Sequence, residues 1–349
     1  MNLVRILLTL LVAAAVGTGC AKKPEPPTFP DEELNWPPPP EPVRVRWLGH
    51  IANSQWAEPP TKLRKTLASI SGNQEIYTFK KPYAVAVDGL GRVFVSDTGW
   101  GGVLVFDRAG QKFGWRGDKG DGALSKPSGV AVDARDHLFV GDINLQRVHE
   151  YEPDGRFVRT IGAGVLIQPV GMAVDTKNNR LWVVDSRLHG MAVFDIATGE
   201  HVRTVGGRGT DDGMFNFPTN IAIGKEEVYV TDTFNFRVQV MDLEGNYLRK
   251  WGRNCDSFGC FSRAKGIAVD SLGNVHVSDA AFNNVQIFSP EGELLLFFGG
   301  IGNGPGRMWL PAGMYIDAKD QIYVVSQYNW RVNLYQFYAT PPSEGPATP

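Results

Sequence analysis

Five aspartates could supply the oxygen ligands of a metal ring, because each ends a short apolar run, such as VFVSD or VYVTD, in a different repeat of the chain. They are Asp97, Asp142, Asp185, Asp232 and Asp279. A short acceptor at the end of a strand can instead bond the backbone of the following turn, and it then recurs because the turn recurs. We therefore expect these carboxylates to be structural. We expect the same of the arginines five residues further on, Arg147, Arg237 and Arg331.

Histidine and cysteine could also carry metal or redox chemistry. The six histidines stand at unrelated positions of the repeats, and no pair of them has the spacing of a metal-binding motif. Cys255 and Cys260 are too few for a zinc site without a neighbouring histidine, and the chain contains no C-x-x-C-H motif for covalent haem. The sequence therefore predicts no metal and no cofactor.

The elements that must position these residues come from a phrase that occurs six times. Its copies are PYAVAVD, PSGVAVD, PVGMAVD, PTNIAIG, AKGIAVD and PAGMYID, and they end at Asp88, Asp133, Asp175, Gly224, Asp270 and Asp317. The spacings are 45, 42, 49, 46 and 47 residues. Further short runs of β-branched and aromatic residues follow each copy, separated by Gly, Asp and Asn turns. Four short strands per repeat of this length form one blade, so we predict an all-β fold, a six-bladed β-propeller.

The two ends of the chain fit a closed ring. The sixth repeat stops after its third strand, near Phe337, whereas residues 43–51 (VRVRWLGHI) have the pattern of a fourth strand. We predict that this N-terminal segment supplies the outer strand of the last blade, which closes the sheet and makes residues 43–338 one domain. In the insertion between residues 55 and 72, Leu63, Leu67 and Ile70 have helical spacing, and we expect a short helix packed on the propeller.

In a propeller, the starts of the first strands surround one mouth of the central channel. The residues at that position are Tyr83, Ser128, Val170, Thr219, Lys265 and Ala312. Lys265 is the one charged residue among them, and Asn220 follows Thr219. An atypical enzyme site, or a site for an anionic ligand, would use Tyr83, Lys265 and Asn220.

The turns between second and third strands lie on the same face and carry large apolar residues. These are Trp100, Leu145, Leu188, Phe234, Phe236, Phe282, Tyr328 and Trp330. Aromatic anchors gathered on one face are typical of protein interfaces. The alternative is that several of them fold down and plug the ring. We favour the interface for the set as a whole.

The pattern P-x-G-V-A-V-D, then V-x-V-S-D-T, then R-V-Q-V-F-D resembles NHL repeats, and VYVTDTFNFRVQVMD from Val228 is the nearest copy. The resemblance covers nearly all of residues 79–337. The first repeat departs from it with Gly101 and Gly102, where Asn and Arg are usual. NHL propellers serve as protein-binding or RNA-binding platforms and, rarely, as enzymes. The resemblance therefore implies the fold and leaves the activity open.

Two enzyme classes with related propellers place their metal ligands at the channel mouth. Amidating lyases that resemble NHL proteins carry zinc-binding histidines there as PH dipeptides, and this chain has no PH dipeptide. Gluconolactonase-type propellers line the channel with Glu, Asn and Asp, and here only Asn220 is nearby. We therefore keep a lactonase-like or lyase-like enzyme as an alternative, beside a propeller that binds a small ligand or glycan.

The N-terminus resembles the signal peptide of a bacterial lipoprotein. Arg5 precedes an apolar run over residues 6–16 that is too short for a permanent membrane span, and GTGC, ending at Cys20, resembles a lipobox with Gly17 where Leu is usual. The resemblance implies that Cys20 becomes lipidated and that the protein is extracytoplasmic and held by a lipid anchor. Ala21 then favours the outer membrane. Simple cleaved secretion and an uncleaved anchor are the alternatives.

Export also gives an interpretation of the residues that follow. Residues 21–42 are rich in proline and favour polyproline II, so we expect a tether, and residues 339–349 are expected to be a disordered tail. In an oxidising compartment, Cys255 and Cys260 would form a disulfide that pins one loop. A redox role is the alternative, although the motif is not C-x-x-C.

Charge argues against a nucleic-acid partner. The net charge is −2, and the four long connections between blades contain eight Lys or Arg against five Asp. Phosphate binding usually needs a larger basic surplus. We therefore expect a monomeric, non-enzymatic propeller that binds an envelope protein through its loop-rich face.

Overall fold

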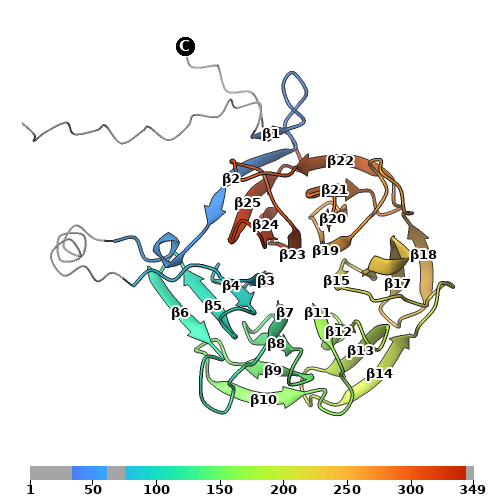
Figure 1. Ribbon diagram of the computed structural model, residues 1–349. Coiled ribbons are helices and arrows are strands. Elements are labelled where there is room, and N and C mark those ends of the chain that lie inside the picture. Colours follow the sequence, from blue (N-terminus) through green and yellow to red (C-terminus); the bar gives the residue numbers. More distant parts are fainter. Residues whose placement is uncertain (1–33, 61–74, 343–349) are drawn as a thin grey trace, which may run out of the picture. The chain divides into compact units, whose positions relative to one another are not determined.

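The structure, a computed structural model, describes residues 34–60 and 75–342, which form six antiparallel sheets in a ring around a central channel (Figure 1). The predicted all-β, six-bladed propeller is confirmed. In each blade the strands follow one another outwards, so the first strand of every repeat lies next to the channel. The innermost strands of neighbouring blades contact each other all the way round, including β23 of the last blade and β3 of the first.

The strands fall into blades that we number I to VI. Blade I has β3 (Pro82–Val87), β4 (Val93–Asp97), β5 (Gly102–Asp107) and β6 (Lys112–Arg116), and blade II has β7 (Pro127–Val132), β8 (Leu138–Asp142), β9 (Arg147–Tyr151) and β10 (Phe157–Ile161). Blade III has β11 (Pro169–Asp175), β12 (Arg180–Asp185), β13 (Gly190–Asp195) and β14 (His201–Gly206), and blade IV has β15 (Asn220–Ile223), β16 (Glu227–Asp232), β17 (Arg237–Asp242) and β18 (Tyr247–Trp251). Blade V has β19 (Ala264–Val269), β20 (Val275–Asp279), β21 (Asn284–Phe288) and β22 (Leu294–Gly299), and blade VI has β23 (Pro311–Ile316), β24 (Gln321–Ser326) and β25 (Arg331–Phe337).

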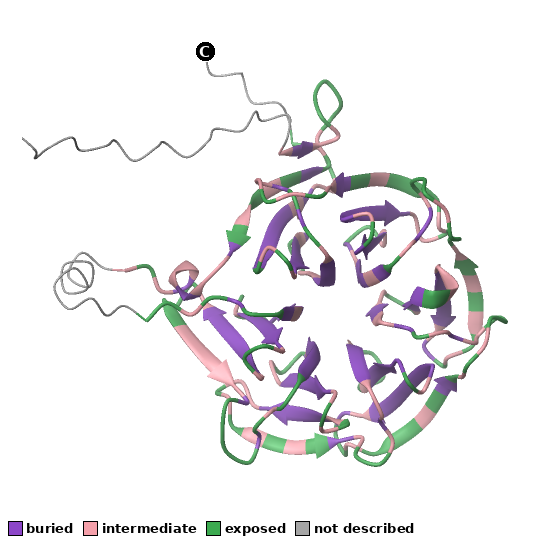
Figure 2. Cartoon of the chain, viewed as in Figure 1, coloured by how far each residue is buried: buried purple, intermediate pink, exposed green. Residues whose placement is uncertain are grey.

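Valine and isoleucine form the core because the three inner strands of a blade are covered on both faces by neighbouring blades. Figure 2 shows these strands as buried, whereas the outermost strands alternate between exposed and partly buried residues. Each buried cluster spans two adjacent blades; Val184 of β12, for example, shares its cluster with Val230 of β16. The stability of the ring therefore resides in the contacts between blades.

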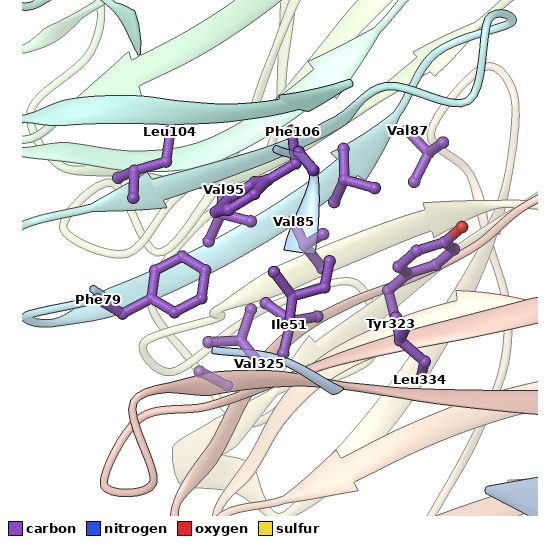
Figure 3. Packing of buried hydrophobic residues seen from close by; sticks show 14 residues of the cluster. Ile51, Phe79, Val85, Val87, Val95, Leu104, Phe106, Tyr323, Val325 and Leu334 are labelled. Carbon is purple, nitrogen blue, oxygen red and sulfur yellow. The ribbon is translucent and has the colours of Figure 1, made fainter. Parts of the chain in front are cut away.

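The N-terminal strand closes blade VI, as predicted. β2 (Val45–Ile51) pairs antiparallel with β25, with Val45 opposite Phe337 and Ile51 opposite Val332. Figure 3 shows Ile51 in the apolar cluster between blades VI and I, together with Phe79. The last strand of the ring is thus packed as firmly as the strands that precede it.

A fifth strand in blade VI was not expected from the sequence. β1 (Asn35–Trp36) pairs with β2, and the ring centroid of Trp36 lies 5.9 Å from those of both Phe298 and Tyr335. The segment predicted as a tether over residues 21–42 therefore already packs on the propeller at β1. The sequence missed this strand because the prolines around Trp36 masked the strand pattern.

Glycine is required where the innermost strands approach each other. A Cβ atom on Gly171 would lie 2.7 Å from the Cα of Asn220, and one on Gly313 would lie 2.8 Å from the Cα of Ala84. Such distances leave no room for any side chain, so the strands of adjacent blades touch backbone to backbone. This contact explains the glycine in the repeated phrase.

Several predictions fall on residues that the structure does not describe. They are the signal peptide with Cys20, the tether up to residue 33, the helix expected around Leu63, Leu67 and Ile70, and the tail beyond residue 342. Two 3-10 turns, η2 (Ser54–Trp56) and η3 (Thr233–Asn235), interrupt the strands. In the described ranges, no helix has the length and hydropathy needed to cross a membrane.

Candidate binding face

The aspartates that end the second strands are fully buried and bond the backbone, as expected. Both carboxylate oxygens of Asp97 are engaged: Oδ2 accepts from the N–H of Lys80 at 2.8 Å, and Oδ1 accepts from Lys81 at 2.9 Å and Gly99 at 2.8 Å. The carboxylate thus joins the loop that enters the blade to the turn that follows. The same position in blades II to V is occupied by Asp142, Asp185, Asp232 and Asp279, and in blade VI by Ser326.

Most residues assigned to the channel mouth hold the blades together instead. Ser128, Val170 and Ala312 are buried. The hydroxyl of Ser128 donates to the carbonyls of Gly141 and Pro169, and the hydroxyl of Thr219 lies 2.8 Å from that of Thr233. The expectation that Ser128 faces the mouth is therefore wrong, because its side chain points into the contact between blades II and III.

Tyr83, Lys265 and Asn220 remain partly exposed. Burial raises the pKa of Tyr83 to about 12. Burial also lowers the pKa of Lys265, and the charge of Arg263 lowers it further. The side-chain oxygen of Asn220 accepts from the N–H of Ile221 at 2.9 Å, which fixes the side chain beside the channel.

The channel contains a cavity of about 300 Å³ whose lining side chains are mostly apolar. Its side chains are those of valine, isoleucine, alanine and methionine, and its polar ones are Thr176, Asn220 and Tyr315. Burial raises the pKa of Tyr315. No group of three or more His, Cys, Asp or Glu side chains that could hold a metal ion occurs within residues 34–60 and 75–342. The cavity therefore offers shape and hydroxyl groups, with no charged group in its lining.

The eight large residues of the turns fall into two classes once the blades are aligned on the buried acceptor. Four stand three residues after the aspartate: Leu145, Leu188 and Phe282 are partly buried, and Trp100 is 37% exposed. Their backbone N–H groups donate to that aspartate, as Leu188 does to Asp185 at 3.0 Å. The other four belong to blades IV and VI and stand two or four residues after the acceptor: Phe234, Phe236, Tyr328 and Trp330.

Trp100 represents the packed class. Its indole nitrogen donates to the carbonyl of Thr78 at 2.8 Å, and its ring contacts Trp115 edge-on at 5.4 Å. The ammonium of Lys80 lies 3.3 Å above the ring. Trp100 therefore packs on the loop that enters its own blade and on the outer strand β6.

Blades IV and VI differ in how the turn bonds the connection that enters the blade. Their third turn residue is asparagine, and its amide holds that connection: Asn235 donates to Gly209 at 2.9 Å, and Asn329 donates to Gly302 at 2.8 Å. The apolar residues of the turn then point outwards. Phe234 is 55% exposed, and Tyr328 is 56% exposed.

Phe234 and Tyr328 each pair with an aromatic residue that the sequence reasoning missed. Phe234 contacts Phe217 at 5.3 Å, and Tyr328 stacks on Trp309 at 5.7 Å. Phe217 and Trp309 belong to the connections between blades, outside the turns between second and third strands. In both connections, GGRGTDDGMFNFP and GGIGNGPGRMWLP, an aromatic residue comes shortly before the final proline, and this signal could have identified them. We call these contacts the two aromatic pairs.

The residue four positions after the aspartate or serine that ends the second strand adopts a left-handed backbone conformation in every blade. It is Gly101, Gln146, His189, Phe236, Asn283 or Trp330, with φ between 48° and 69°. In this conformation, a residue other than glycine or asparagine costs about 1–2 kcal/mol of folding free energy. Trp330 nevertheless occupies the position and is 56% exposed. Neither the backbone nor packing explains why a tryptophan stands there.

The disulfide expected between Cys255 and Cys260 is present, with 5.5 Å between the Cα atoms. The loop that it closes carries Phe258, which is exposed and stacks on Phe297 of β22 at 3.6 Å. This loop lies in the connection between blades IV and V, so it separates the two aromatic pairs along the ring.

Comparison with known proteins begins with the sequence. No family model matches the chain. It is 33% identical over 122 residues to the protein brain tumor of Drosophila melanogaster, covering 34% of this chain and 12% of that protein. It is 30% identical over 155 residues to human NHL repeat-containing protein 2, covering 35% of this chain and 21% of that protein.

An enzyme is also among these relatives. A probable peptidyl-alpha-hydroxyglycine alpha-amidating lyase of Caenorhabditis elegans is 25% identical over 192 residues, covering 52% of this chain and 51% of that protein. The chain thus spans at most about half the length of these curated relatives.

Solved structures show the same fold. A streptogramin B lyase superposes with a TM-score of 0.56 at 12% identity, covering 76% of this chain and 84% of the other. A gluconolactonase from Xanthomonas campestris superposes with a TM-score of 0.58 at 14% identity, covering 74% and 87%. At these identities the likeness extends to the propeller alone.

Proposed function

We propose, from the premise that this chain is a six-bladed β-propeller of NHL-type repeats, that it binds a protein of the cell envelope through the two aromatic pairs and Trp330. The observation that carries the proposal is the placement of Trp330. Its backbone conformation favours glycine or asparagine, and its side chain is more than half exposed. A residue that costs stability and covers no core has its explanation in a contact outside the chain.

The chemistry of the surface fits a protein partner. Tryptophan, tyrosine and phenylalanine bury large areas with few rotatable bonds, and they dominate the energetics of protein interfaces. The pairs already hold their rings in fixed contact, which lowers the entropy lost on binding. The net charge of −2 gives no general attraction to nucleic acid.

The location is part of the proposal. The resemblance of residues 1–20 to a lipoprotein signal peptide supports an extracytoplasmic, lipid-anchored protein, with the outer membrane favoured. The disulfide between Cys255 and Cys260 is consistent with an oxidising compartment. A propeller held in this way would present its loop-rich face to another envelope protein.

The test is cross-linking in intact envelopes followed by affinity measurement with the protein recovered. Phe234→Ala and Tyr328→Ala should each weaken binding about 30-fold, equivalent to about 2 kcal/mol. Leu248→Ala, an equally apolar and exposed change on the outer strand β18, is the matched control and should leave the affinity unchanged. Equal binding by all three variants would contradict the proposed face.

An enzyme acting at the channel mouth is the second candidate, since an amidating lyase is among the relatives and Tyr83, Lys265 and Asn220 stay partly exposed there. An activity screen on peptidyl-hydroxyglycine and lactone substrates would test it, with Lys265→Ala as the comparison. Turnover by the wild type that is lost in the variant, with the aromatic variants fully active, would favour this candidate.

A further inference from the structure

The buried aspartate of blade IV accepts from four groups. One oxygen of Asp232 takes the N–H of Asn216 at 2.7 Å. The other is the meeting point of three side-chain donors: the amide of Asn235 at 2.8 Å, Nε of Arg237 at 2.8 Å and the amide of Gln239 at 3.2 Å. Each of these three side chains also donates a hydrogen bond to a backbone carbonyl of the connection that enters the blade.

Blade VI repeats this arrangement without the second oxygen. The hydroxyl of Ser326 accepts from the N–H of Trp309 at 2.9 Å, and so replaces the first oxygen of the aspartate. The three donors have counterparts in Asn329, Arg331 and Asn333, which also reach the carbonyls of their connection. Within the described part of the chain, nothing takes the place of the oxygen on which they would converge.

Arg331 is the residue most affected by the missing acceptor. Its Nη atoms donate to the carbonyls of Asn303, Gly304 and Arg307, whereas its buried Nε has no partner among the described residues. Arg237 has an ion pair with Asp232 at the same atom, 2.8 Å long. Arg331 forms no ion pair with any described carboxylate.

The surroundings of Arg331 add no negative charge. The residue is 7% exposed. Its charge affects the pKa of two titratable groups, His50 and Tyr335. The pKa of His50 is lowered mainly by burial and further by the charge of Arg331. A buried guanidinium without a counter-ion is costly, and its pKa is lowered by burial.

We propose that blade VI binds a small monovalent anion, such as chloride, beside Ser326, Asn329 and Arg331, in the position that the second carboxylate oxygen of Asp232 occupies in blade IV. The anion supplies the missing acceptor and the missing charge together. The site adjoins Trp309 in the hydrogen-bond network, because the backbone N–H of Trp309 donates to Ser326. The bound anion therefore also steadies the connection that carries one of the two aromatic pairs.

An ordered water molecule is the competing occupant. The side-chain oxygens of Asn329 and Asn333 are buried and have no partner in the described residues, so they could accept the hydrogens of a water. A water would satisfy the hydrogen bonds and leave the charge of Arg331 uncompensated. The two occupants therefore differ in their dependence on anion concentration.

The first test measures the melting temperature of the whole protein in sodium chloride mixed with sodium gluconate at constant ionic strength. Above the dissociation constant, each tenfold increase in chloride should raise the melting temperature by about 3 °C. Ser326→Asp supplies the oxygen and the charge covalently. It should melt higher than the wild type in gluconate and show no chloride dependence. A wild type indifferent to chloride, or a variant with the same dependence, would overturn the proposal.

The second test locates the anion directly. Crystals grown in sodium bromide should show an anomalous peak within hydrogen-bonding distance of Nε of Arg331, and the peak should be absent from Ser326→Asp crystals. Density without anomalous signal would mean a water only and would refute the proposal. Asp232→Ser opens the same vacancy in blade IV and should create a second bromide peak. If that variant does not fold, the Ser326→Asp comparison still decides.

Discussion

Blade IV is made from one continuous stretch of chain, whereas blade VI takes β2 from the N-terminal side of the propeller and its other strands from the C-terminal end. The two blades share a long glycine-rich connection, an asparagine in the turn, a buried arginine and an exposed aromatic pair. They differ in the acceptor that ends the second strand, Asp232 in one and Ser326 in the other.

The difference between Asp232 and Ser326 shows how each blade is stabilised. Blade IV is fixed from inside, by a carboxylate that gathers the turn, the connection and the arginine. Blade VI lacks that centre, takes its fourth strand, β2, from the N-terminal side and gains one further strand, β1, on its outer edge. The packing of Trp36 on Phe298 and Tyr335 adds to this outer support. Similar exposed surfaces thus stand on two differently supported blades.

Removing the outer support of blade VI should have the largest effect. Deleting residues 1–52 removes β1 and β2, uncovers the edge of β25 and takes Ile51 out of the cluster with Phe79. We expect the loss of cooperative unfolding, measured by calorimetry. Deleting residues 1–33 leaves both strands and is the control. A cooperative transition in the longer deletion would show that β2 is dispensable.

The second-largest effect should come from removing the buried acceptor that ends the second strand, and its size should differ between the two blades. Asp232→Ala leaves Arg237 as a buried unpaired charge and should cost about 4 kcal/mol of unfolding free energy. Ser326→Ala removes only the two bonds with the backbone of Trp309 and should cost about 1–2 kcal/mol. Denaturant titration of both variants measures the gap, and equal losses would refute the distinction between the blades.

The indole of Trp36, which packs on blade VI, should contribute an amount of unfolding free energy between those two losses. Trp36→Ala removes the ring that contacts Phe298 and Tyr335 and should lower the unfolding free energy by about 3 kcal/mol. Trp36→Phe should restore most of that loss, since an aromatic edge would again meet both rings. Chemical denaturation checks the pair. An unchanged unfolding free energy in Trp36→Ala would mean that the packing of β1 adds nothing to the stability of the blade.

The smallest effect should be a gain. Trp330→Asn and Phe236→Asn place a residue that tolerates positive φ in the left-handed turn and should raise stability by up to about 1 kcal/mol. Trp330→Asn should nonetheless weaken partner binding. Thermal unfolding beside the binding assay tests both. Loss of stability in Trp330→Asn would mean that the indole is needed for packing, which contradicts its assignment to the interface.

The fold could be predicted from the sequence because its causes are local and repeated. The alternation of valines, the glycine that permits backbone contact at Gly171 and Gly313, and the buried aspartates all recur at one spacing. Even β2 could be assigned, because a missing fourth strand at one end and an unpaired strand pattern at the other have a single simple solution.

The candidate face could be predicted only in part. The turns were correctly placed on one face, but Trp100 and Trp330 looked alike in sequence. The sequence does not show that Asn329 bonds the connection entering blade VI at Gly302, and the aromatic turn residues on either side of Asn329 are exposed. Ser128 was misplaced because the neighbouring strand, which buries its hydroxyl, is 41 residues away.

The pairing of β2 with β25 also determines how the propeller would respond to mechanical load. Tension between the two chain ends would act on one end of an antiparallel ladder, where Val45 faces Phe337 and Arg44 bonds Ala339, and would open the ladder one pair at a time. Tension between the N-terminal side and a partner held near Trp330 would instead pull β2 along its own axis. All the pairs from Val45 to Ile51 would then share the force. The same strand resists little force when its pairs open one by one and more force when they are sheared together. The anchored, partner-binding protein that we propose would load the strand in shear.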